Sequence, residues 1–144
     1  MNFASIQSQL KETRGTTWRA VIDDRFRLLG WPLAIEIQTR SIPDESPLPE
    51  ITVEESQLAD MILNGLKTVI AESERLLEDD PAIEHLRGNG DAMIVTPHIW
   101  ISSETLMEEG PTRWAMVLEI DVNPDFGWHI EFDGLCALEI WAGD

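Results

Sequence analysis

The chain has 144 residues, of which 43% are hydrophobic and 26% are charged, so its composition argues against disorder and favours a single folded domain, residues 1–144. Asp and Glu number 27 against 10 Lys and Arg, which gives a net charge of −17. This charge repels nucleic acid phosphates and anionic membranes. It therefore argues against nucleic acid and membrane partners and favours a basic protein partner.

Cysteine content and the N-terminal residues indicate the compartment. Cys136 is the only cysteine, which rules out an intrachain disulfide and a metal site built from paired cysteines. Residues 1–15 lack the basic start and apolar run of a signal peptide, and no stretch approaches the length of an apolar membrane span. We expect a cytoplasmic protein, and the sequence leaves its oligomeric state open.

The first half of the chain predicts two strands and then a helix. Residues 16–23 and 32–39 show partial alternation and β-branched content, which is typical of a hairpin. Thr52 and Glu55 match the S/T-x-x-E pattern that begins a helix, which we expect to run over residues 52–79 with a bend at Gly65. One side of this helix is an apolar stripe that only Ser73 interrupts: Leu58, Ile62, Leu66, Val69, Ser73, Leu76 and Leu77.

The second half changes to a period of two and predicts four strands in series, at residues 97–103, 113–122, 127–132 and 135–143. The order of strands, helix and strands indicates an α+β domain. We expect an antiparallel sheet of about six strands, with a C-terminal four-strand meander and one long helix packed on one face.

Turn signals predict the register of the last three strands. Asp133-Gly134 is a two-residue hairpin signal that sets Phe132 opposite Leu135, and a five-residue loop at 123–127 sets Leu118 opposite Phe132. The face expected under the helix has one charged misfit, Glu139, among eleven other residues: Trp114, Met116, Leu118, Ile120, Val122, Trp128, Ile130, Phe132, Leu135, Ala137 and Trp141.

The same register brings four polar residues together on the opposite face. It places Asp121 across from His129 and Glu119 across from Glu131. Two carboxylates directly opposite each other on neighbouring strands destabilise the sheet by about a few tenths of a kcal/mol, so a ligand or a basic partner is expected to offset their repulsion. One interpretation is a surface that binds a basic protein. The alternative is a divalent metal site in a metal-dependent enzyme or metal-binding protein.

Other catalytic or cofactor sites find little support. Asp121, Asn123 and Asp125 match the start of a calcium loop, but Phe126 and Phe132 stand where that loop needs Gly and Glu. No nucleotide-binding loop, zinc spacing or activated nucleophile is evident. We therefore assign no catalytic residue and no cofactor, and an enzyme is the less favoured interpretation.

The segment FGWHIEF, residues 126–132, has the form aromatic-Gly-x-x-Ile-x-Phe. Together with the acidic charge and the long helix, it resembles a broad class of small bacterial proteins of unknown function, some of which are immunity proteins of toxin systems. The resemblance implies an α+β fold and a non-enzymatic role, in which acidic groups steer the protein onto a basic toxin. Glu119, Asp121, His129 and Glu131 are the residues we expect to contact such a partner.

Overall fold

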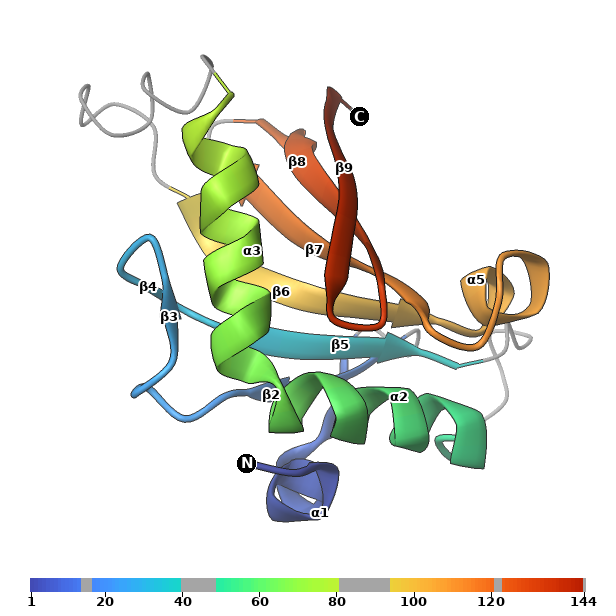
Figure 1. The fold of residues 1–144 in the computed structure, drawn as a ribbon. Coiled ribbons are helices and arrows are strands. Elements are labelled where there is room, and N and C mark those ends of the chain that lie inside the picture. Colours follow the sequence, from blue (N-terminus) through green and yellow to red (C-terminus); the bar gives the residue numbers. More distant parts are fainter. Residues whose placement is uncertain (14–16, 40–48, 81–93, 121–122, 144) are drawn as a thin grey trace.

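The computed structural model describes residues 1–13, 17–39, 49–80, 94–120 and 123–143 (Figure 1). Within these ranges the main sheet has seven strands in the order β1-β2-β5-β6-β7-β8-β9, and β3 and β4 form a separate pair. The strands are β1 (Lys11–Thr13), β2 (Thr17–Val21), β3 (Arg27–Leu28), β4 (Trp31–Pro32), β5 (Ala34–Gln38), β6 (Ile94–Ser102), β7 (Arg113–Ile120), β8 (Asn123–Asp133) and β9 (Cys136–Gly143). The helices are α1 (Phe3–Ile6), the 3₁₀ turn η1 (Gln7–Gln9), α2 (Val53–Asn64), α3 (Leu66–Glu78) and α5 (Ser103–Glu108).

The predicted α+β class is confirmed, with differences in the number and direction of the strands. β2 and β5 form the expected antiparallel hairpin, and β6 to β9 form the expected meander. The sheet is mixed because β5 and β6 run parallel. Parallel neighbours need a crossover connection, and α2 and α3 lie between these two strands in the chain.

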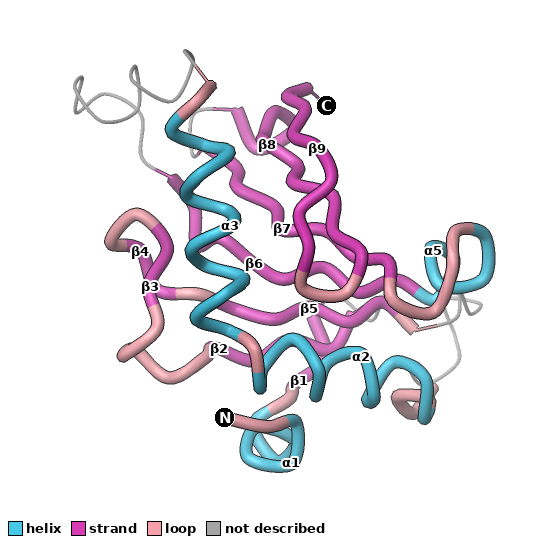
Figure 2. The backbone as a smooth tube through the Cα atoms, viewed as in Figure 1, coloured by secondary structure: helices cyan, strands magenta, loops and turns pink. Residues whose placement is uncertain are grey.

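The expected single helix is two helices, α2 and α3, which meet at Gly65 and run in different directions (Figure 2). A Cβ atom at Gly65 would lie 2.4 Å from Cδ1 of Leu135, so the β8–β9 turn packs directly against the break. The start is as predicted, because Thr52 and Glu55 form the reciprocal bonds of a capping box.

Both helices pack on one face of the sheet, called here the inner face; the opposite face is the outer face (Figure 1). The predicted helix stripe is buried except for Leu76, which is half-buried. On the sheet side, Trp114 stacks on Phe132 with ring centroids 4.3 Å apart. The strand residues predicted to face the helix and found buried are Trp114, Met116, Leu118, Trp128, Ile130 and Phe132.

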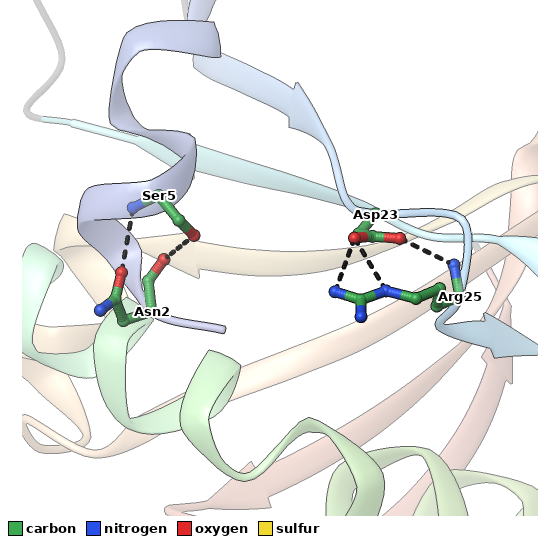
Figure 3. Close-up of polar contacts among 4 residues, drawn as sticks. All are labelled: Asn2, Ser5, Asp23 and Arg25. Atoms are coloured by element: carbon green, nitrogen blue, oxygen red, sulfur yellow. Dashed lines mark hydrogen bonds and ion pairs between the residues drawn. The ribbon is translucent and has the colours of Figure 1, made fainter.

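Short polar contacts fix the N-terminal part of the fold (Figure 3). Asn2 caps α1, because its side-chain oxygen accepts a hydrogen bond from the Ser5 amide at 3.0 Å. In the turn after β2, the Asp23 carboxylate accepts hydrogen bonds from the amide and the Nε of Arg25, each at 3.0 Å. Both contacts are local, as expected for side chains that replace missing backbone partners.

The register between β7 and β8 differs from the prediction by four residues. Leu118 lies opposite Trp128 and not opposite Phe132, and β8 begins at Asn123, so the predicted loop at 123–127 is wrong. Because the shift is even, the residues of β7 up to Glu119 and those of β8 from Gly127 onward still point to their predicted faces. Gly127 has a packing role, since a Cβ atom there would lie 2.5 Å from the carbonyl oxygen of Leu118.

The register between β8 and β9 also differs, and a bulge explains the misfit in the predicted core face. Asp133 pairs with Cys136, so Gly134, at a φ of 61°, is the first of two turn residues. Further along β9 the bulge inserts Leu138 as an extra residue. It turns Glu139 to the outer face and brings Ile140 against the core. It also turns Trp141 outward, contrary to the prediction.

Candidate functional site

Strand pairing arranges the outer face into two neighbouring rows that cross the sheet from β5 to β9. One row contains both described histidines and ends at a tryptophan: Ala34, His98, Val117, His129 and Trp141. The next row contains the carboxylates: Glu36, Trp100, Ala115, Glu131 and Glu139. Val117 and Ala115 of β7 lie in the middle of these rows. They separate the polar and aromatic residues of β5 and β6 from those of β8 and β9.

The four residues predicted to form one cluster do not all come together. Glu119 lies opposite Gly127, and Glu131 lies opposite Ala115, so the predicted pair of carboxylates is wrong. The two Glu positions share a face but are four residues apart along the strand, about 13 Å. Asp121 lies outside the described residues. The four-residue register shift accounts for this separation.

His129 and Glu131 instead meet Trp141 of β9. The His129 and Trp141 rings stack with centroids 3.9 Å apart and planes 7° from parallel. The indole Nε1–H of Trp141 donates a hydrogen bond to Oε1 of Glu131 at 3.0 Å. Trp141 is 41% exposed, so a large side chain is held by a stack on one ring face and by a hydrogen bond from its Nε1–H, while much of it stays open to solvent.

Burial of the His129 side chain determines whether its ring is charged. Burial lowers the pKa of His129 from its ordinary value of 6.5, and the nearby Glu131 carboxylate opposes this effect. The imidazole is therefore mainly neutral at neutral pH. A neutral ring leaves the negative charge of Glu131 without a neutralising cation from His129.

A pair of opposed carboxylates does occur on this face, between strands β8 and β9. Glu131 lies directly opposite Glu139, beside the bulge at Leu138. β9 is the last strand of the sheet, and Leu138 is 48% exposed. The edge strand β9 therefore carries an exposed tryptophan, an exposed leucine and one member of the acidic pair, and β8 carries the other member.

The group on β5 and β6 is satisfied internally. Nη1 of Arg19 lies 2.6 Å from Oε1 of Glu36, and Nε2 of His98 lies 3.6 Å from the other carboxylate oxygen. The rings of His98 and Trp100 form a T-shaped pair, with ring centroids 6.3 Å apart. No sequence pattern links His98 to Glu36, because the two residues lie on parallel strands that are far apart in the chain. These contacts are typical of a structural ion pair.

Two further observations concern metal ligands and membrane-spanning helices. Within the described ranges, no three His, Cys, Asp or Glu residues are grouped so that they could hold a metal ion. In the same ranges, no helix combines the length and apolar character that crossing a bilayer requires.

Comparisons with known proteins add no relative: no family model, curated protein or solved structure matches the chain.

Proposed function

We propose that this chain is a non-enzymatic acidic binding protein that contacts a basic protein, in the manner of an immunity-type inhibitor. The contact surface in this proposal consists of His129, Glu131, Glu139 and Trp141, called here the Trp141 surface. The observation that carries the proposal is Trp141 itself, which is exposed yet fixed by a ring stack and a hydrogen bond.

An exposed, fixed tryptophan suits protein recognition for energetic reasons. Tryptophan is enriched among the residues that contribute most to binding, because one side chain buries a large area. Binding usually costs free energy to order side chains at the interface. His129 and Glu131 already hold the indole of Trp141, so much of this cost is met before the partner arrives.

The charges around Trp141 favour a basic partner. An arginine guanidinium can lie on an indole face and donate hydrogen bonds to neighbouring carboxylates, which Glu131 and Glu139 provide. The net charge of −17 would also speed encounter with a basic protein. Of the four residues expected from the sequence, His129 and Glu131 belong to this surface, and Glu119 lies apart from it. No grouping of described residues favours the metal-dependent alternative.

The test is association of the purified chain with basic proteins encoded beside its gene, followed by surface plasmon resonance. Trp141→Ala should weaken binding at least tenfold, mainly through faster dissociation. Glu131→Gln with Glu139→Gln should slow association and reduce its dependence on salt.

Val21→Ala is the matched control for the loss of an exposed apolar side chain, because Val21 is 56% exposed and lies in β2, which is separated from β9 by four other strands of the sheet. This variant should bind as wild type does. A partner whose binding is indifferent to Trp141→Ala and to the double substitution would contradict the proposal.

A further inference from the structure

A pocket of about 540 Å³ lies between the start of α2 and α5. Leu106, Met107 and Pro111 give it an apolar side, and Glu54 and Glu55 give it an acidic side. Its volume is in the range of pockets that bind small molecules, and apolar walls with a few polar groups are typical of them. None of these residues belongs to the Trp141 surface.

Glu55 is an unusual residue to find in such a pocket. Its side chain is buried, with 0% exposure, although Glu is rarely buried without a charged partner. One carboxylate oxygen, Oε2, accepts a hydrogen bond from the Thr52 amide at 3.1 Å as part of the capping box. The other oxygen, Oε1, is buried and has no hydrogen-bond partner among the described residues.

An unsatisfied carboxylate oxygen costs free energy, so its retention needs an explanation. Leaving a buried acceptor without a donor costs about 1–3 kcal/mol, and more for a charged group. The capping box does not require a charged side chain, because Gln at the same helix position can form the same reciprocal bond. The capping role therefore explains the hydrogen bond of Glu55 to the Thr52 amide, but it does not explain the negative charge of Glu55.

We propose that this pocket binds an organic cation with an apolar stem, an alkylammonium or alkylguanidinium group, whose N–H groups donate to Oε1 of Glu55. The stem would lie against Leu106, Met107 and Pro111, and Glu54 would add a second negative charge. An anionic ligand is excluded by the two carboxylates, and a neutral apolar ligand would leave Oε1 without a donor. The inference does not rest on the function proposed above, because it uses different residues.

The cation could be a free small molecule or a Lys or Arg side chain of a protein. Titrations with n-butylguanidinium chloride and n-butylammonium chloride, monitored by the amide NMR signals of Glu54, Glu55 and Met107, test the shared chemistry. A short glycine peptide with one central arginine separates the two sources. If it binds as n-butylguanidinium does, the site accepts a protein side chain; if it does not, the site is confined to free cations.

The expected result is saturable binding of the butyl cations in the millimolar range, and none of neutral n-butylurea. Glu55→Gln should weaken binding at least tenfold, because it removes the charge while keeping the cap. Glu108→Gln, an exposed position in α5, makes the same change in net charge and should have no effect. A thermal unfolding curve shows whether Glu55→Gln is folded. Absence of saturable binding by wild type, or equal binding by Glu55→Gln, would overturn the proposal.

Discussion

Trp141 and His129 stack almost face to face, with ring centroids 3.9 Å apart, although the sequence pattern assigned them to opposite faces of the sheet. The bulge at Leu138 reverses the face to which the later residues of β9 point, and this brings Trp141 to the same face as His129. It also couples a titratable group to the exposed indole. The ionisation of His129 should therefore affect both stability and the Trp141 surface.

The first prediction concerns the pH dependence of that coupling. Burial lowers the pKa of His129 in the folded state, so the unfolded chain binds its proton more readily. The stability that the protein gains from the neutral His129 ring is present above pH 6.5, the ordinary pKa of histidine. It is lost as the pH falls from there through the lower pKa of His129 in the folded state. His129→Phe keeps an aromatic ring that cannot titrate. The unfolding free energy of wild type minus that of His129→Phe should be constant above pH 6.5 and should fall below it.

Urea unfolding from pH 5 to pH 8 measures this difference. The other titratable groups are common to both proteins, so to a first approximation their contributions cancel. A difference that stays flat across the whole range would show that the folded state does not disfavour protonation of His129.

The second prediction concerns the contact between Gly65 and Leu135. Gly65→Ala introduces a Cβ atom 2.4 Å from Leu135 Cδ1, so it should destabilise the wild type by about 1–3 kcal/mol. In a Leu135→Ala background the crowding is gone, and the same substitution should be neutral or stabilise by up to about 1 kcal/mol. A double-mutant cycle from urea unfolding measures the coupling. Additive effects would mean that the turn does not press on the helix break.

The third prediction tests the inner face. Ile130 and Phe132 are both 0% exposed, so replacement of either by Ala should lower the unfolding free energy by about 2–5 kcal/mol. Leu138→Ala is the control on a neighbouring strand. It lies at the bulge with 48% exposure and should cost about 0.5 kcal/mol or less. Equal losses at Phe132 and Leu138 would contradict the assignment of the faces.

The sequence predicted the faces of the strands better than their register. Alternation along a strand is a local property, and it survives a register error of four residues because four is even. The predicted register depends on a loop at 123–127, which contains Pro124 and Gly127, two residue types that are typical of turns. In the structure Pro124 is the second residue of β8, and Gly127 allows close approach to the Leu118 carbonyl. A glycine that forms a turn and a glycine that allows two strands to pack closely cannot be told apart in the sequence.

The candidate site was predicted only in part, for two physical reasons. A bulge reverses the face of every later residue, so Trp141 was assigned to the core when Leu138 was counted as a regular strand residue. The contact of His98 with Glu36 depends on a parallel pair of strands, which no turn signal links. Glu55 matches the capping pattern in the sequence, but the pocket that it lines together with α5 depends on a helix that the sequence does not predict.

The last prediction concerns Glu55 in the absence of any ligand. Burial raises the pKa of Glu55 above its ordinary value of 4.5, against the hydrogen bonds from Thr52. Between 4.5 and the raised pKa the unfolded chain loses the proton more readily, so wild-type stability falls over this window and stays lower above it. Glu55→Gln keeps the cap and cannot ionise. It should therefore be more stable than wild type at pH 7, with an advantage that shrinks as the pH falls through that window. Urea unfolding at pH 4 to pH 8 checks this, and a wild type that is the more stable protein at pH 7 would show that the Glu55 carboxylate already has a compensating partner.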